Sequence, residues 1–255
     1  MKTARLSFFQ LRYVNKAFWR NPASAFFTFA LPLIFLVIFT ALLGQGQVNV
    51  AGHVIHLSTY YVAAMSAFAV ITTCYNNTAI SLTVQRDTGV LKRINGVPLP
   101  SAVYFAARVL HALLVSVLLV AITVAFGVAA YQADIPDAVS LVRLLVTLVV
   151  GAASFCALGF AITAAIPNSD AAAPIVYATI LPLLFLSGVF IPIGDNAPAW
   201  ITWTARIFPV KHFADGIQAG LLGTPFSWTD VLIIAAWGIA GLLLALRYFS
   251  WQPRT

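Results

Sequence analysis

The sequence predicts an all-α integral membrane protein with six transmembrane helices. Charged residues make up 8% of the 255 residues, against about 25% in soluble domains, and hydrophobic residues make up 61%. The mean hydropathy is +0.94, and the chain contains no glutamate. A soluble protein with a large core would need polar helix faces, which the apolar segments lack. The composition therefore excludes a soluble fold.

Six apolar segments reach the length that a membrane span requires, about 20 residues. They are Phe26–Leu43, Leu57–Val84, Ala112–Ala133, Leu144–Ile166, Ala171–Ile193 and Trp228–Leu246. No loop between them is long enough for a soluble domain, so we expect residues 1–255 to form a single transmembrane domain. Cys74 and Cys156 fall inside these segments, where buried small side chains are far commoner than a disulfide or a metal pair.

Residues 1–22 predict a basic amphipathic helix at the cytosolic membrane interface. Apolar side chains recur at helical spacing between Leu6 and Trp19, with cations among them. Asn21-Pro22 then ends this helix and begins span one. Two interpretations stay open: a membrane anchor only, or a helix that also helps to cradle a partner protein.

Span two carries a polar run at residues 72–78. Asparagine in a membrane span usually forms a hydrogen bond with a neighbouring helix. The alternative is that Thr73, Tyr75, Asn76 and Asn77 line a substrate pathway.

A polar island, residues 85–100, separates spans two and three. If Gln85–Ile94 is one helix, Arg86 and Arg93 share a face because they are seven residues apart. Val90, Leu91 and Ile94 then form another, apolar face, as in an amphipathic docking helix. Pro98 and Pro100 prevent the helix from continuing into span three.

Lysine and arginine alternate with the hairpins between spans, which predicts the orientation of the chain. They are frequent before span one, in the island and after span six, and absent from the loop at residues 44–56. The positive-inside rule therefore puts both ends of the chain and the island in the cytoplasm. Arg206 and Lys211 are exceptions, since the number of spans places them outside.

Residues 192–225, between spans five and six, are too apolar for an ordinary loop. Two pieces, residues 197–208 and 210–222, are each too short to span a bilayer, and Trp200 and Trp203 favour the headgroup level. We expect two short re-entrant helices that dip into the outer leaflet with periodic lipid exposure. A Trp-rich interfacial loop without re-entry is the alternative.

The sequence lacks the residues that proton coupling, ATP hydrolysis and metal binding require. All seven acids lie in a loop or at a predicted membrane boundary, which argues against a proton-driven transporter. The chain has no Gly-x-x-x-x-Gly-Lys-Ser/Thr loop, so we expect no ATPase activity of its own. His53 and His56 provide only two ligands, too few for a closed metal site. We therefore expect no cofactor and no metal, and the scattered cations do not indicate a nucleic-acid partner.

Three patterns resemble the ABC-2 type exporter permeases, the membrane subunits of bacterial drug, lipid and polysaccharide exporters. The island pattern is Gln85-Arg86-Asp87-x-Gly89-x-Leu91-Lys92-Arg93-x-x-x-x-Pro98-Leu99-Pro100. The others are Arg20-Asn21-Pro22 before span one, and Phe190-Ile191-Pro192 followed by Pro198-Ala199-Trp200 and Phe208-Pro209-Val210. The resemblance covers the whole chain. Asp87 departs from it, because family members often carry glutamate there, but the charge is preserved.

The resemblance implies that two permeases, identical or homologous, dock two separate ABC ATPase subunits, which bind ATP and Mg. The island residues that it assigns to ATPase coupling are Arg86, Asp87, Gly89, Leu91, Lys92 and Arg93. The N-terminal residues that would cradle the ATPase are Arg12, Lys16 and Arg20. The substrate would leave between the two permeases, and the implied location is the bacterial cytoplasmic membrane.

By composition, the daunorubicin-resistance branch, which exports drugs or lipids, is the most similar. We therefore expect a permease subunit that exports an amphipathic drug or a lipid-like substrate. The permease of a polysaccharide or teichoic-acid exporter is an alternative. A non-transporting scaffold or a membrane-embedded enzyme is a further alternative, although no convergent catalytic groups are visible.

Overall fold

The computed structural model describes residues 2–43, 46–50, 52–97, 99–131, 137–193 and 197–252, with side chains from residue 5 onward. The helices are α1 (Lys2–Trp19), α2 (Pro22–Leu43), α3 (Leu57–Ile71), α4 (Asn77–Asp87), α5 (Val90–Asn95), α6 (Ser101–Tyr131), α7 (Ala138–Ile162), α8 (Ser169–Leu186), α9 (Ala199–Ile207), α10 (Pro209–Leu222) and α11 (Trp228–Tyr248). A π-helix, η1 (Thr72–Asn76), joins α3 to α4. Strands β1 (Gln47–Val50) and β2 (His53–His56) form an antiparallel hairpin in which Gln47 pairs with His56.

Six helices are long and apolar enough to cross a membrane, which confirms the predicted number of spans. They are α2, the continuous run α3–η1–α4, α6, α7, α8 and α11. Several boundaries differ from the prediction, and the two largest differences are in spans three and five. Span three begins at Ser101 rather than Ala112, because hydrogen bonds hold Arg108 against α4. Span five ends at Leu186 rather than Ile193, since Gly188 takes a positive φ of 78° just beyond it.

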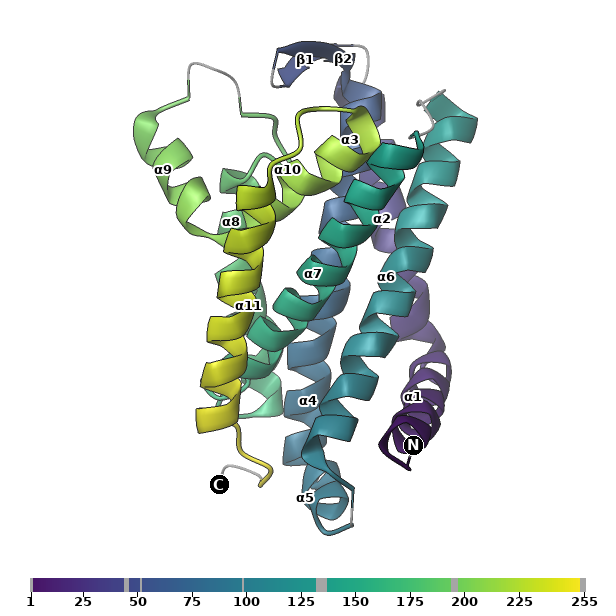
Figure 1. The fold of residues 1–255 in the computed structure, drawn as a ribbon, viewed down its shortest axis with the longest axis vertical. Coiled ribbons are helices and arrows are strands. Elements are labelled where there is room, and N and C mark those ends of the chain that lie inside the picture. Colours follow the sequence, from purple (N-terminus) through teal and green to yellow (C-terminus); the bar gives the residue numbers. More distant parts are fainter. Residues whose placement is uncertain are drawn as a thin grey trace.

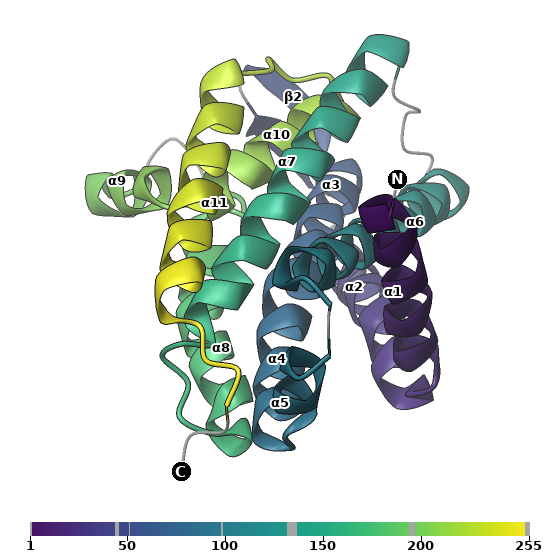
Figure 2. The same ribbon diagram turned by 60° about the horizontal axis from the view of Figure 1, so that its bottom comes forward.

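The spans form an elongated bundle with two different ends (Figure 1). The β-hairpin, α9 and α10 lie at one end, called the hairpin end. Helix α5 lies at the other, called the α5 end, which Figure 2 turns toward the viewer. Span two is the most enclosed, with 78% of its apolar window buried, against 17% for α2 and 22% for α8. Helices α2, α6, α7 and α8 pack around α3–η1–α4, whereas α11 packs on α7 and α10.

Small residues bring span four into close contact with its neighbours. A Cβ atom added at Gly151 would overlap the Phe213 ring, and one at Gly159 would lie 3.0 Å from the carbonyl oxygen of Tyr75. Gly238 of α11 approaches Ser154 of α7 in the same way. Since larger side chains do not fit there, α7 holds span two, α10 and α11 at contact distance.

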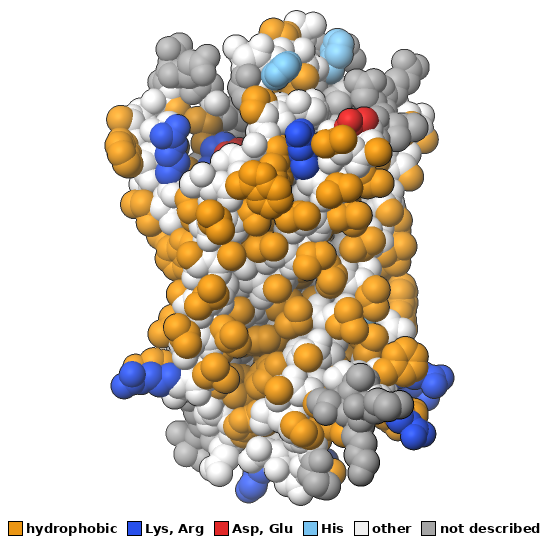
Figure 3. All heavy atoms as spheres, viewed as in Figure 1, with side chains coloured by type: hydrophobic (Ala, Val, Ile, Leu, Met, Phe, Trp, Pro, Cys, Tyr) orange, Lys and Arg blue, Asp and Glu red, His pale blue; other side chains and the backbone are white. Residues whose placement is uncertain are grey.

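An apolar band covers the middle of the face seen in Figure 3, and lysine and arginine side chains lie toward both ends. The six spans are helices, in which most backbone groups pair internally, as a bilayer requires. The band and the six spans together make the chain a multi-pass membrane protein.

The segment between spans five and six forms two short helices, as predicted, but the expectation of periodic lipid exposure is wrong for α10. Its residues Val210, Phe213 and Ile217 are fully buried. Close approach explains this burial, because a Cβ atom at Gly220 would lie 2.7 Å from the Cβ atom of Leu144 in α7. Helix α10 is thus a core element of the hairpin end, while α9 exposes Trp200 and Trp203. Residues 194–196 of this segment lie outside the described residues.

Candidate functional site

The polar island does not form one helix, so the predicted helix Gln85–Ile94 is wrong. Helix α4 ends at Asp87, and α5 begins at Val90. Between them Gly89 takes a left-handed φ of 73°, which other residues adopt at a cost. The break puts Arg86 and Arg93 on different helices rather than on one face. Pro98, predicted to stop the helix, lies outside the described residues.

Arg86 lies inside the protein, with 2% of its surface exposed. Its Nη1 donates to the carbonyl oxygen of Thr163, and its Nη2 donates to those of Ile166 and Pro167, each at 3.0 Å. These carbonyls follow the end of α7, where intrahelical partners are missing. One guanidinium, with its fixed fork of donors, therefore satisfies three backbone acceptors. Its burial also means that Arg86 cannot touch a docked protein directly.

Asp87 extends this connection to α8. Its Oδ1 accepts a hydrogen bond from Arg86 Nε at 3.0 Å, and its Oδ2 accepts one from the backbone N–H of Ser169. Ser169 is the first residue of α8, where a carboxylate satisfies a free N–H and complements the helix dipole. We call Arg86 and Asp87 together the clasp. The clasp joins the end of span two to spans four and five.

Arg108 of α6 holds α4 from the opposite side. Its Nη1 donates to Ser81 Oγ at 3.1 Å, and its Nη2 donates to Gln85 Oε1. Tyr104 Oη donates to the same Gln85 oxygen at 2.9 Å. No local sequence pattern indicates this role, because Arg108 is simply one more cation near the island. Together with the clasp, these bonds fix α4 to three other spans.

Helix α5 has one side packed on the bundle and one side in solvent. Leu91 is fully buried and Ile94 packs against the same core, so the apolar face anchors α5 to its own chain. Lys92 and Arg93 are exposed. Of the predicted coupling residues, only these two cations are both charged and accessible. Arg86, Asp87, Gly89 and Leu91 position them.

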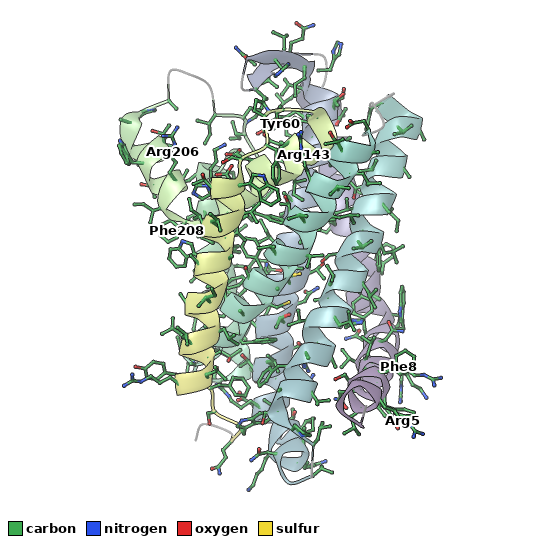
Figure 4. The ribbon with its side chains drawn as sticks, viewed as in Figure 1. Arg5, Phe8, Tyr60, Arg143, Arg206 and Phe208 are labelled. Atoms are coloured by element: carbon green, nitrogen blue, oxygen red, sulfur yellow. The ribbon has the colours of Figure 1, made fainter. Side chains whose placement is uncertain are left out.

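Helix α1 presents its cations to solvent. Arg12, Lys16 and Arg20 are all exposed. The helix packs on α6 and α2 through Phe18, whose ring centroid lies 5.3 Å from that of His111. Arg5 and Phe8 point away from the bundle in Figure 4. The exposed mixture of aromatic and basic side chains fits a helix at a membrane interface.

The polar run of span two coincides with the π-helix η1. Its side chains reach three different helices: Cys74 contacts Ser116 of α6 at 3.3 Å, and Tyr75 Oη lies 2.9 Å from Thr179 Oγ1 of α8. Asn77, the residue that follows, donates to Thr28 Oγ1 of α2 at 3.3 Å. Short π-helices inside α-helices often occur at functional sites.

Asn76 and Thr73 differ from these neighbours. Both amide atoms of Asn76 and the hydroxyl oxygen of Thr73 are buried and have no hydrogen-bond partner in the described part of the chain. A buried polar atom without a partner costs about 1–3 kcal/mol. Water or a polar group of a passing ligand would relieve this cost. Of the four predicted pathway residues, Tyr75 and Asn77 thus form hydrogen bonds to other helices. Thr73 and Asn76 have buried polar atoms without a hydrogen-bond partner among the described residues.

A second polar network joins the helices of the hairpin end. His212 of α10 lies 2.6 Å from Asp230 of α11 through Nδ1, and its Nε2 lies 2.8 Å from the carbonyl oxygen of Arg206 in α9. Asp215, predicted to lie in a loop or at a boundary, is instead in α10 and forms an ion pair with Lys211. Burial raises the pKa of the Asp215 carboxyl, and Lys211 opposes the shift.

Within the described residues, no three histidine, cysteine or aspartate side chains gather into a possible metal site. His53 and His56 stand at opposite ends of β2. The site of interest is therefore the island with its clasp, together with the polar run above it.

The profile of the ABC-2 type transporter family matches residues 9–222, from α1 to the end of α10. The chain belongs to this family. The match includes the island, the clasp residues and the polar run of this ABC-2 protein.

Three relatives illustrate the range of similar proteins. The "Probable multidrug ABC transporter permease YbhR" of Escherichia coli (strain K12) is 32% identical over 138 residues, 54% of this chain and 37% of that protein. The "Putative transport permease ycf38" of Porphyra purpurea is 25% identical over 241 residues, 91% of this chain and 79% of that protein. The "Daunorubicin resistance ABC transporter permease protein DrrB1" of Streptomyces coeruleorubidus is 26% identical over 222 residues, 86% of this chain and 75% of that protein. The chain thus matches about a third of the length of the Escherichia coli relative.

Proposed function

We propose that this ABC-2 protein is the permease subunit of an ATP-driven exporter of amphipathic drugs or lipid-like molecules. Two of its relatives carry the words multidrug and daunorubicin resistance in their names, which supports this substrate class. The chain contains no phosphate-binding loop, so a separate ABC ATPase supplies the energy. The single observation that carries the proposal is α5, a short basic helix held at one end of the bundle by buried contacts.

The α5 end faces the cytoplasm in this proposal. The cations of α1, α5 and the last turn of α11 support that orientation under the positive-inside rule. Three cations lie at the hairpin end, Arg143, Arg206 and Lys211, of which Lys211 is paired with Asp215. The ATPase then docks on Lys92 and Arg93, flanked by the exposed cations of α1. The membrane is the bacterial cytoplasmic membrane.

Force passes from α5 to the spans through the clasp. Leu91 prevents α5 from sliding on the bundle, and Arg86 and Asp87 connect α4 to the α7–α8 turn. Arg108 connects α4 to α6. A movement of α5 caused by ATP-driven closure of the ATPase therefore displaces spans two to five together rather than bending the island.

The substrate pathway lies beside η1 and between two permeases. Tyr75 and Asn77 reach α8 and α2, the two least enclosed spans. A second copy, or a homologue, packed against those spans would place η1 near the dimer axis. The unsatisfied amide of Asn76 and hydroxyl of Thr73 are the groups that would bind polar parts of the substrate.

The proposal is tested by drug efflux from a hypersensitive bacterial strain that expresses this chain with its ABC ATPase. We expect active efflux of an amphipathic cation such as daunorubicin, and none when the catalytic glutamate of the ATPase is replaced. The purified chain alone should not hydrolyse ATP. Efflux that persists without a functional ATPase, or ATP turnover by the pure chain, would overturn the proposal.

A further inference from the structure

An open groove of about 560 Å³ lies at the hairpin end, between the first turns of α7 and α11. It is lined by Ala138, Val139, Val142, Arg143, Phe226 and Trp228. Five of these six side chains are apolar, and Val139, Val142 and Trp228 are exposed. Arg143 is the single charge. The groove is therefore an apolar, membrane-facing surface with one cation set into it.

Arg143 has no ion-pair partner in the described residues. The guanidinium lies 5.8 Å from the centroid of the Phe226 ring, as a cation over an aromatic face. Asp137, six residues earlier, uses its carboxylate to accept a hydrogen bond from the backbone N–H of Ser140 at 3.1 Å. Lys211, at the same end of the molecule, is by contrast paired with Asp215. Hydrogen bonding with Ser140 lowers the pKa of the exposed Asp137 carboxyl, and the charge of Arg143 also helps to lower it. The described residues nevertheless form no ion pair with the guanidinium, so its donors stay available to a second anion.

The position of Arg143 along α7 puts it near the boundary between headgroups and hydrocarbon. The 25 residues of α7 span about 37 Å, and the hydrocarbon core is about 30 Å thick. Arg143 lies five residues into the helix, about 8 Å from its start. Trp228, the first residue of α11, lines the same groove, and tryptophan favours this depth. A half-buried arginine here can extend its charge toward the phosphate layer.

We propose that this groove binds a membrane glycerophospholipid, with its phosphate on the Arg143 guanidinium and an acyl chain on Val139 and Val142. Charge complementarity selects this occupant. An unpaired cation that faces lipid is costly, and the phosphate layer is the nearest plentiful source of anions. The planar guanidinium can donate two parallel hydrogen bonds to phosphate oxygens. Neither the proposed substrate nor the ATPase is needed for this binding.

Arg206 provides a matched control. It is also a cation at the hairpin end, in the last turn of α9, and it is exposed (Figure 4). It does not line the groove. Removing either arginine changes the net charge by the same amount, so any difference between the two variants reports on the groove.

The test titrates the purified full-length chain, in a phosphate-free detergent, with phosphatidylglycerol and with diacylglycerol of the same acyl chains. Native mass spectrometry counts the bound lipids. We expect wild type and Arg206→Ala to bind phosphatidylglycerol alike, and Arg143→Ala to bind it about fivefold more weakly. Diacylglycerol, which lacks the phosphate, should bind wild type as weakly as phosphatidylglycerol binds Arg143→Ala. Val142→Trp should weaken binding of both lipids because it fills the groove.

Two results would overturn the proposal. One is equal binding of phosphatidylglycerol by Arg143→Ala and wild type. The other is a loss of dimer rather than of lipid in Arg143→Ala, which would make the groove a protein interface. Each variant is compared with its own lipid-free form, so a general loss of stability does not mimic either result. Failure of drug export would leave this binding measurement unaffected.

Discussion

The end of α4 and helix α5 are adjacent in the sequence, and both carry arginine, but they serve the protein differently. Arg86 is enclosed and bound to three carbonyl oxygens, whereas Arg93 is exposed. Asp87 holds the start of α8, whereas Lys92 is also exposed. One basic motif thus combines an internal anchor with an exposed basic surface, which is the proposed docking site. Substitutions at the anchor should affect folding, and substitutions at the surface should affect only partner binding.

The largest effect is expected from Arg86→Ala. It leaves three buried carbonyl oxygens without donors and Asp87 without its cation, which should lower the free energy of unfolding by about 3–5 kcal/mol. Thermal unfolding in detergent measures this loss. Arg86→Lys should recover only part of it, because an ammonium group lacks the fork that reaches all three acceptors. An unchanged free energy of unfolding in Arg86→Ala would show that Arg86 does not anchor the end of α4.

Asp87→Ala should lower the free energy of unfolding by a smaller amount, about 1–2 kcal/mol. It removes the acceptor for the Ser169 N–H and the partner of Arg86 Nε, but the carbonyl partners of Arg86 remain. Asp87→Glu is the informative companion, because it keeps the negative charge and lengthens the side chain by one methylene. We expect it to retain most of the stability in the same unfolding assay. Equal loss in both variants would indicate that side-chain length, and not charge, matters.

Gly89→Ala tests the break between the two regions. Alanine at position 89 should lower the free energy of unfolding by about 1–2 kcal/mol, because it disfavours the positive φ of 73°. The loss comes from the backbone alone, since no atom lies within 4 Å of an added Cβ atom. Gly96→Ala is the matched control, since Gly96 has a φ of −80° and its Cβ atom would meet only ordinary contacts. Its stability should change by less than about 0.5 kcal/mol. The same change for both glycines would show that the left-handed break is not required.

The membrane spans could be predicted from the sequence, whereas the buried role of Arg86 could not. Long apolar runs determine membrane spans locally, so their number was predicted correctly. The start of α6 was missed because Arg108 and His111 lower the local hydropathy. Arg108 is accommodated by Gln85 and Ser81, which lie in another span. Partners so distant in sequence leave no local pattern.

The buried role of Arg86 could not be predicted for the same reason. Its acceptors are backbone carbonyls about 80 residues away, and every residue type carries such a carbonyl. The burial of α10 depends likewise on Gly216 and Gly220, which lie against Thr147 and Leu144 of α7. The charge of Lys92 and Arg93, by contrast, indicated an exposed surface directly, because unpaired lysine and arginine are almost never buried.

Binding of the ABC ATPase to the double variant Lys92→Glu and Arg93→Glu tests the central claim most directly. Both side chains are exposed, so the free energy of unfolding should change by less than about 0.5 kcal/mol. Arg247→Glu, an exposed cation in the last turn of α11, is the control for net charge. We predict that co-purification with the ATPase and ATP-dependent efflux are lost in the double variant and retained in Arg247→Glu. A correctly inserted double variant that binds the ATPase and exports as wild type does would contradict the account.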